Sequence, residues 1–300
     1  PTSPPFGLAC LKGSLAIARP NVTLKVRDWN LAFFRRWLQG TPPHLCDVDP
    51  DHLLGKLCPH LLLEDGLGQE IYKQLRHIPT SEVETDRYMS TVKQMDELFH
   101  SLHTFFYGLL LPEVEGYSRL SKEMLQLIFA EELAEIEAEQ PDLLGFSILA
   151  EQNLFYALAL ARTVKEQYEI PIALGGAMMS HLDPEEILRA FPWIDFVFWG
   201  EGEQTLVDFV DAWEESDRDD WEGVMGLAHR TPEGLPCVHS SPQTPDLQAL
   251  PFPDFSDYAL DSYLTPDPVL PIITCRGCYW GKCAFCSHIL PYAPGVRVRS

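Results

Sequence analysis

The feature that most constrains this chain is a regular alternation of apolar runs and helical segments between residues 141 and 215. The runs DLLGFSIL, PIALGGA and IDFVFWG are almost continuously hydrophobic, which is typical of parallel strands buried on both faces. A segment with helical periodicity follows each of them. The pattern predicts an α/β fold with a doubly wound parallel sheet and helices on both faces.

Ligands of such sheets bind beyond the carboxyl ends of the strands. The first apolar run ends at Ser147 and Leu149, and the second ends at Gly175 and Gly176. Paired glycines let a backbone pass close to a ligand, and they also suit a plain strand-to-helix turn. The third run leads into an acidic turn made of Gly200, Glu201, Gly202 and Glu203. An acidic residue near the start of a helix also stabilises the helix dipole, so Glu203 has a structural alternative as well.

The segments before this alternation predict the rest of a first domain, residues 1–215. Residues 5–18 have the pattern of a helix, and residues 21–30 alternate like a strand ending at Asp28. A helix followed by a strand implies an earlier strand that this sequence lacks. Residues 41–140 predict a helical insertion, with one amphipathic helix capped by Ser121, and no chemistry is assigned to it.

The composition changes after residue 215. Residues 216–267 contain a predicted hairpin around Pro232–Gly234 and a proline-rich stretch, which indicate an extended linker rather than a packed element. PVLPIIT, residues 268–274, predicts a buried strand that opens a second domain over residues 268–300.

Four cysteines follow this predicted strand in TCRGCYWGKCAFCSH, with the spacing C-x2-C-x4-C-x2-C. Three chemistries fit four thiols: a structural zinc ion, a redox pair and an iron–sulfur cluster. Zinc ribbons usually separate their two C-x2-C pairs by about 15 to 20 residues, and a redox pair is expected at a helix start that is not evident here. A cluster tolerates closely spaced thiolates, because each cysteine binds a different iron, so the spacing favours a cluster.

The strand followed by RGCYWGKCAFC resembles the cluster loop of radical S-adenosylmethionine (radical SAM) enzymes. The resemblance implies that Cys278, Cys283 and Cys286 bind a 4Fe-4S cluster, that SAM binds the remaining iron, and that Phe285 lies beside the adenine. The C-x4-C-x2-C spacing departs from the family's usual C-x3-C-x2-C and is similar to that of some cobalamin-dependent branches. Cys275 is additional, and we expect a buried, small hydrophobic side chain there rather than a ligand.

The upstream domain resembles the Rossmann-like cobalamin-binding domain of class B radical SAM proteins, many of which are methyltransferases. The resemblance rests on SIL at 147–149, GG at 175–176 and the GEGE turn. It implies that cobalamin binds at the carboxyl ends of the strands, without a protein histidine ligand because the D-x-H-x-x-G element is missing. The cobalamin-binding residues it implies are Ser147, Leu149, Gly175, Gly176, Gly200, Glu201, Gly202 and Glu203.

These resemblances imply an enzyme that transfers a methyl group to an unactivated carbon of a natural product or peptide through a 5'-deoxyadenosyl radical. An external electron donor such as flavodoxin or ferredoxin would be a partner. The alternatives are a radical SAM enzyme that catalyses a rearrangement or cyclisation, and a non-catalytic cobalamin-type module with a zinc knuckle. We expect the sequence to be truncated at both ends, with only the start of a radical SAM partial barrel, and to be inactive alone.

Charge and the scattered residues narrow the setting. A formal net charge of -22 disfavours nucleic-acid partners. No apolar run reaches the roughly 18 residues of a membrane span. Cys10, Cys46, Cys58 and Cys237 stand singly, which indicates reduced thiols and a cytoplasmic location. We expect His181, His229 and His239 to lie in loops without partners.

Overall fold

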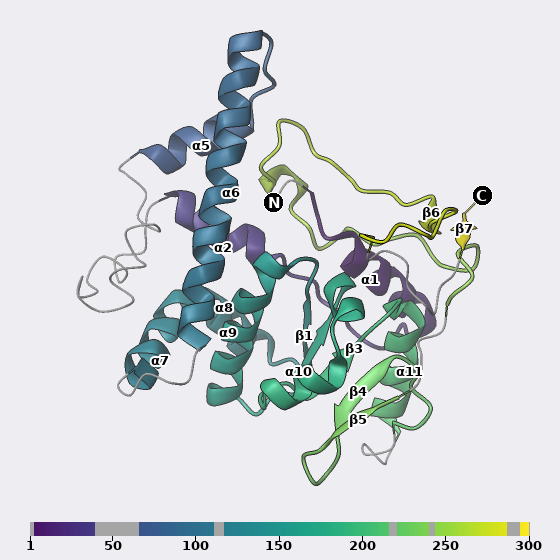
Figure 1. Ribbon diagram of the computed structural model, residues 1–300. Coiled ribbons are helices and arrows are strands. Elements are labelled where there is room, and N and C mark those ends of the chain that lie inside the picture. The colour runs from purple at the N-terminus through teal and green to yellow at the C-terminus, as the bar shows by residue number, and fades with distance from the viewer. Residues whose placement is uncertain are drawn as a thin grey trace.

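The computed structural model shows a central sheet with helices on both sides and a long helix projecting from one end (Figure 1). The predicted helices that fall in residues 40–65 and 111–116 lie outside the described residues. The structure describes residues 3–39, 66–110, 117–215, 221–239, 244–286 and 295–299.

Five strands form the central sheet, in the order β1-β2-β3-β4-β5. The first three strands are parallel, as the apolar runs predict, whereas the last two are antiparallel and form the predicted hairpin. The described sheet is therefore mixed, and its strands follow chain order rather than the reversed order of a doubly wound sheet. The hairpin extends this sheet instead of belonging to a separate linker. The strands are β1 (Leu144–Ser147), β2 (Ile172–Gly175), β3 (Phe196–Phe198), β4 (Leu227–Arg230) and β5 (Pro236–Val238).

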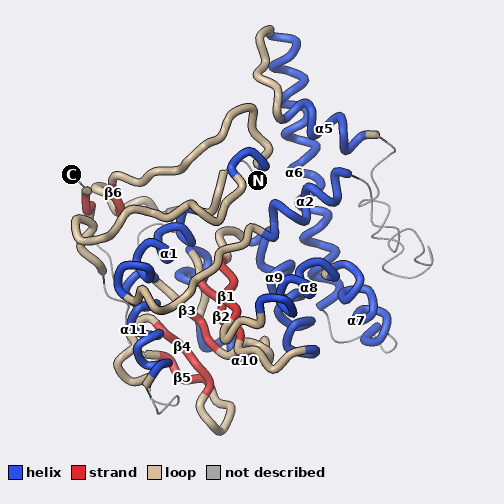
Figure 2. The backbone as a smooth tube through the Cα atoms, turned by 180° about the vertical axis from the view of Figure 1, so that it is seen from behind, coloured by secondary structure: helices blue, strands red, loops and turns tan. Residues whose placement is uncertain are grey.

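Helices cover both faces of the sheet, as predicted (Figure 2). On one face, α9 (Glu151–Gln167) and α10 (Pro184–Ala190) pack against the strands. The other face is covered on its β3 and β4 side by α11 (Gly202–Glu214), which packs against α1 (Phe6–Ala18). α9 is buried on more than one side, because its buried residues include a run of five consecutive positions, which reaches around the helix. These residues include Leu154, Ala157, Leu158, Ala161 and Val164.

The predicted helical insertion shares its core with the sheet. Aromatic side chains from α2, α6 and the α7–α8 junction, among them Trp37, Phe106 and Phe129, belong to the same buried cluster as Phe146 of β1. The predicted helix over residues 121–140 is two helices joined at Phe129, and the first begins before Ser121, so the predicted cap is wrong. The helices are α2 (Trp29–Gln39), α5 (Leu67–Leu75), α6 (Glu82–Leu110), α7 (Tyr117–Ile128) and α8 (Ala130–Glu139).

The segment before α2 does not form the predicted strand. Residues 23–28 are in neither helix nor strand, and α2 begins at Trp29. Alternation alone was misleading here, because the segment packs against residues 254–264 without pairing with the sheet. The backbone N–H of Val26 donates to Asp257 at 2.7 Å, and the Tyr263 hydroxyl donates to Asp28 at 2.8 Å.

The predicted extended linker is packed rather than free. Tyr258 and Tyr263 are buried beside Ala9 and Leu31, so the segment closes a small third core against α1 and α2. The close approach depends on Gly13 of α1, where an added Cβ would lie 2.3 Å from the carbonyl oxygen of Phe252. This part of the linker prediction is wrong, because aromatic side chains among the prolines supply apolar surface to bury.

The predicted buried strand at 268–274 is also wrong. Residues 268–273 are irregular and Ile272 is 81% exposed. The strand begins later, as β6 (Cys275–Gly277), which pairs antiparallel with β7 (Val296–Val298) in a separate two-stranded sheet. An apolar run becomes a buried strand only where another layer covers it, and no described element covers this one.

Candidate functional site

Small residues at the carboxyl ends of β1 and β2 leave part of the sheet uncovered. Ser147 and Gly175 are cross-strand partners, so two of the predicted cofactor residues are neighbours on one face. Gly145 and Ser147 of β1, and Leu149 just after the strand, alternate toward this face and are all exposed, with Leu149 at 72%. A Cβ added at Gly145 would meet no atom within 4 Å. The face therefore has room for a flat ligand group against the strands, which fits the cobalamin predicted here.

Gly176 is required by the protein backbone itself. Its φ is +97°, and an added Cβ would lie 2.5 Å from the carbonyl oxygen of Ile148 and 2.6 Å from its nitrogen. Gly175 is different, since its added Cβ would make only an ordinary contact, 3.5 Å from Phe198 Cβ. At Gly176 the close approach is thus made by the chain's own backbone, as in the plain strand-to-helix turn that the paired glycines also suit.

The GEGE turn directs two carboxylates away from the sheet. Gly200 has a φ of +90°, and its N–H donates to Ser180 Oγ at 2.9 Å, which fixes the turn after β3. Gly202 begins α11 and packs closely on Leu11 of α1, because an added Cβ would lie 3.3 Å from Leu11 Cδ2. Glu201 and Glu203 then point toward β6 and β7, with side chains that are only 12% and 6% exposed.

Two arginines from the cysteine-bearing hairpin bind these carboxylates. Arg276 of β6 donates to Glu201 Oε2 at 2.7 Å and to Glu203 Oε2 at 3.2 Å, and a further short hydrogen bond joins it to Glu203. Arg297 of β7 donates to Glu201 Oε2 at 3.1 Å and to the Pro245 carbonyl at 3.0 Å. We name the group Arg276, Arg297, Glu201 and Glu203 the arginine clamp. It attaches the hairpin to the carboxyl edge of the sheet.

The electrostatics of the arginine clamp reflect its burial. Burial alone would lower the pKa of Arg276, but the hydrogen bonds and charges of Glu203 and Glu201 outweigh it and raise that pKa above its usual value. Cys10 of α1 lies next to the clamp and receives a hydrogen bond from Arg276. Burial and the Glu203 charge raise the pKa of the Cys10 thiol to about 11, so this cysteine is protonated at neutral pH.

The cysteine loop begins where β6 ends. Gly277 has a φ of +93°, and an added Cβ would lie 2.0 Å from the carbonyl oxygen of Gly295, so the glycine of the RGC stretch lets the two strands meet. The N–H of Cys278 donates to the same carbonyl at 3.2 Å, and the N–H of Cys286 donates to the Cys283 carbonyl at 3.1 Å. Hydrogen bonds from the backbone N–H groups of Gly281 and Trp280 lower the pKa of Cys278, which favours its thiolate.

The three predicted cluster ligands are partly exposed free thiols. Among the described residues, they do not form a group with all ligand atoms within 4.8 Å of one another. A tetrahedral zinc site needs sulfur atoms about 3.8 Å apart, whereas a cubane spreads its thiolates over separate iron corners. The partial exposure of these thiols leaves them accessible to a metal ion or cluster.

The surroundings of the loop differ from the sequence prediction at Cys275. This residue is exposed at the start of β6 rather than buried, because no element of the described part of the chain covers it there. Phe285 is 91% exposed, and Tyr279 and Trp280 are exposed beside it. The hairpin therefore presents a set of aromatic side chains around the cysteines.

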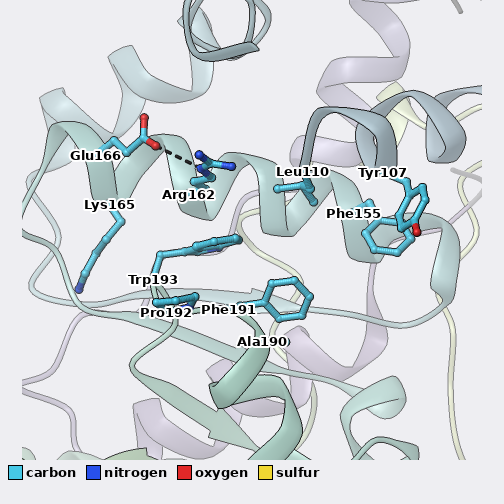
Figure 3. Close-up of a pocket in the computed structure, with 10 residues that line it drawn as sticks. All are labelled: Tyr107, Leu110, Phe155, Arg162, Lys165, Glu166, Ala190, Phe191, Pro192 and Trp193. Carbon is cyan, nitrogen blue, oxygen red and sulfur yellow. Dashed lines mark hydrogen bonds and ion pairs between the residues drawn. The ribbon is translucent and has the colours of Figure 1, made fainter. Parts of the chain in front are cut away.

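A cleft of about 680 Å³ lies elsewhere, between α6, α9 and the segment that precedes β3 (Figure 3). Arg162 stacks over Trp193 at 5.5 Å and pairs with Glu166 at 3.1 Å, so its charge is already compensated. The cleft adjoins the amino end of β3, away from the carboxyl edge that carries the predicted cofactor residues. We assign it no part in the site.

One group of functional candidates on the β4–β5 hairpin was not predicted from the sequence. His229 lies on β4 rather than in a loop, and its ring stacks on that of His239 with centroids 5.1 Å apart. Cys237 of β5 is the cross-strand partner of His229. The available signal was one histidine on the first strand of the hairpin and C-x-H on the second, and it could be recognised only with the register of the hairpin.

The described helices include none with the length and apolarity needed to cross a membrane.

Residues 122–210 match the family model of the B12 binding domain. The matched segment begins in α7 and ends in α11, so it contains the open face of β1 and β2 and the GEGE turn. The residues that form the carboxyl edge of the sheet thus lie in a region with the sequence character of a cobalamin-binding domain.

Three curated proteins are similar to this chain. An uncharacterized methyltransferase of Pyrococcus horikoshii is 27% identical over 176 residues, which are 58% of this chain and 37% of the relative. An anaerobic magnesium-protoporphyrin IX monomethyl ester cyclase of Rubrivivax gelatinosus is 28% identical over 156 residues, 50% of this chain and 27% of the relative. A hopanoid C-3 methylase of Methylococcus capsulatus is 29% identical over 173 residues, 57% of this chain and 32% of the relative. The chain thus spans about a third of the length of these enzymes.

Proposed function

We propose that this chain is the cofactor-binding part of a cobalamin-dependent radical SAM enzyme, whose reaction is methyl transfer to an unactivated carbon of a small molecule or peptide. The observation that carries the proposal is the arginine clamp. Through Arg276, two residues before Cys278, the clamp attaches the cysteine loop to the edge of the sheet where the B12 binding domain match lies. Two cofactors that must act on one substrate need this proximity.

Each cofactor has residues in this chain suited to hold it. Cys278, Cys283 and Cys286 would bind a 4Fe-4S cluster, and Phe285 would lie against the adenine of SAM. The open face beside Ser147 and Gly175 would receive the nucleotide part of cobalamin, without a histidine ligand to cobalt. When bound, the cluster would supply an electron to SAM and cobalamin would supply a methyl group.

The chain's own contribution is binding and positioning. Lowering of the Cys278 pKa by backbone N–H groups prepares the thiolate that iron binds. The exposed aromatic side chains around the loop would exclude water once a substrate and the rest of the enzyme cover them. An external electron donor of the flavodoxin or ferredoxin class would reduce the cluster. Three similar proteins named methyltransferase, cyclase and methylase support an enzyme.

The cluster is tested by anaerobic reconstitution with iron and sulfide. We expect about four irons per chain, with loss of most of that iron in Cys278→Ala, Cys283→Ala and Cys286→Ala. Cys275→Ala is the matched control in the same loop and should keep full iron. A reconstituted chain without iron, holding a zinc ion that is lost in Cys278→Ala, would contradict the proposal and favour a zinc knuckle.

Cobalamin binding is tested separately by equilibrium dialysis. Ser147→Trp places an indole on the open face and should weaken binding at least tenfold, whereas Leu235→Trp adds the same group at the exposed tip of the β4–β5 hairpin and should not. Equal binding by both variants would contradict the assignment of the open face.

A non-methylating reaction is the second candidate, because one similar protein is named a cyclase. The complete enzyme, incubated with SAM carrying a deuterated methyl group, distinguishes the two. Label in the product establishes methyl transfer, and unlabelled product establishes rearrangement or cyclisation.

A further inference from the structure

The β4–β5 hairpin gathers three metal-binding side chains on one face of the sheet. His229, Cys237 and His239 each offer a ligand atom, and these atoms all lie within 4.8 Å of one another. The register explains the grouping. His229 and Cys237 are directly opposite across the strands, and the N–H of His239 donates to the Leu227 carbonyl at 2.9 Å, which continues the ladder two residues further. Residues two apart on a strand share a face, so all three side chains project together.

Hydrogen bonding prepares His229 as a ligand. Its Nδ1 lies 3.0 Å from the carbonyl oxygen of Arg230, a distance at which Nδ1–H donates to that oxygen. With the proton on Nδ1, Nε2 is the ring nitrogen that carries a lone pair, and this neutral form of imidazole is the one that binds metal ions. Histidine ligands in metal sites commonly donate their second ring N–H to a backbone carbonyl or carboxylate in this way.

The hairpin that carries these groups is held firmly. The guanidinium of Arg230 donates to the carbonyls of Ile194 at 2.8 Å and Phe191 at 3.1 Å, which fixes β4 to the segment before β3. His229 is buried and its ring lies 6.2 Å from that of Trp221. A ligand on a fixed strand loses little conformational freedom when it binds, which favours binding.

Access and donor chemistry indicate which ion would bind. Cys237 is a free thiol, and both it and His239 are partly exposed, so an ion can enter from solvent. Two imidazoles and a thiolate are ligands typical of zinc, and their donor atoms would lie about 3.3 to 3.7 Å apart around a tetrahedral ion. The three donor atoms lie within 4.8 Å of one another, so shifts of about 1 Å in side-chain position would bring them to that spacing. The net charge of -22 also attracts a cation.

We propose that His229, Cys237 and His239 bind one Zn²⁺ ion, with a fourth position open to water. The site is separate from the cysteine loop and does not depend on the proposed enzyme activity. It would join the last two strands at the end of the sheet, where β5 pairs on only one side among the described strands. Three protein ligands and an open position are also the arrangement of catalytic zinc sites.

The test uses Co²⁺ as a spectroscopic substitute for Zn²⁺ on the full chain, with Cys275, Cys278, Cys283 and Cys286 replaced by serine so that the loop cannot bind metal. We expect a thiolate-to-cobalt charge-transfer band in this parent. Cys237→Ser should remove that band together with one equivalent of bound metal, and His239→Gln should weaken binding at least tenfold. His77→Gln, at an exposed histidine, is the control and should bind like the parent.

Protection of the native chain gives a second readout that needs no substitution. Saturating Zn²⁺ should slow alkylation of Cys237 by iodoacetamide at least tenfold, as measured by peptide mass spectrometry. Alkylation of Cys275 in the same unsubstituted chain is followed in parallel. Equal metal binding by the parent and Cys237→Ser, or unchanged alkylation of Cys237 in zinc, would overturn the proposal.

Discussion

Removal of Arg276 should release the cysteine hairpin from the sheet. In Arg276→Ala, Glu203, whose side chain is only 6% exposed in the native structure, loses its arginine, and Glu201 keeps only Arg297. Loss of one partner from a buried ion pair typically costs about 3 to 5 kcal/mol. Because Arg276 is 19% exposed and water can reach part of the site, we expect the lower end, about 3 kcal/mol.

A double-mutant cycle isolates the contact itself. Urea unfolding of Arg276→Ala, Glu203→Ala and the double variant should give a coupling free energy of about 2 kcal/mol. The pair Arg189–Glu185 on α10 is the internal control, since its side chains are 60% and 43% exposed. That surface pair should couple by only about 0.3 to 0.5 kcal/mol.

Cys10 provides a local readout, because it lies next to the arginine clamp and becomes accessible when the hairpin detaches. An opening made easier by about 2 to 3 kcal/mol corresponds to roughly 30- to 150-fold faster alkylation of this thiol. Arg297→Ala should also accelerate alkylation of Cys10. Because Arg297 is not among the charges that shift the Cys10 pKa, this increase would reflect opening of the hairpin rather than a change in thiol ionisation. A coupling no larger than that of Arg189–Glu185, together with unchanged Cys10 alkylation, would refute the arginine clamp as the attachment.

Three further outcomes follow from single residues. Burial raises the pKa of Cys10 from its usual 9.0 to about 11. The unfolded chain therefore loses this proton at lower pH than the folded chain, and the free energy of unfolding falls as the pH rises from 9 to 11. Cys10→Ala should flatten this decline, measured as the urea midpoint against pH. Gly176→Ala should destabilise by more than about 2 kcal/mol, since its Cβ would strike the Ile148 backbone, whereas Gly145→Ala, with open space, should change the melting temperature little. Asp183→Ala removes the side chain that accepts a hydrogen bond at the start of α10 and should cost about 1 kcal/mol in urea unfolding.

The alternation of strands and helices was predictable because it is written in local periodicity. Each apolar run between residues 141 and 200 contains an observed strand, and each is followed by a helix. The position of Ser147 opposite Gly175 then follows from the parallel register, which places strand ends at one edge. The cofactor roles of these residues stay predictions, because a periodicity that specifies a strand does not specify what binds at its end.

Two predicted strands failed for one physical reason. Residues 21–30 and 268–274 have strand-like patterns, but a strand needs a neighbour to receive its hydrogen bonds and a layer to cover its apolar face. The first segment meets the aromatic side chains of Tyr258 and Tyr263 instead, and the second has no cover among the described residues. His229 and His239 show the opposite failure, because an interaction was present where none was expected. Their rings stack only because of the register of the β4–β5 hairpin, which cannot be inferred from each histidine by itself.

The arginine clamp changes how the GEGE turn is interpreted. Sequence left two roles for Glu201 and Glu203, stabilisation of the helix start and hydrogen bonding to cobalamin amides. In the structure, both carboxylates accept hydrogen bonds from Arg276. If they turned toward a ligand, the positive charge of the buried Arg276 guanidinium would lose its carboxylate partners, which would cost several kcal/mol. The acidic turn and the arginine of the RGC stretch therefore act as one unit. In this chain, the segment with the cysteines carries the arginines and the GEGE turn carries the carboxylates. These opposite charges bring the two segments together.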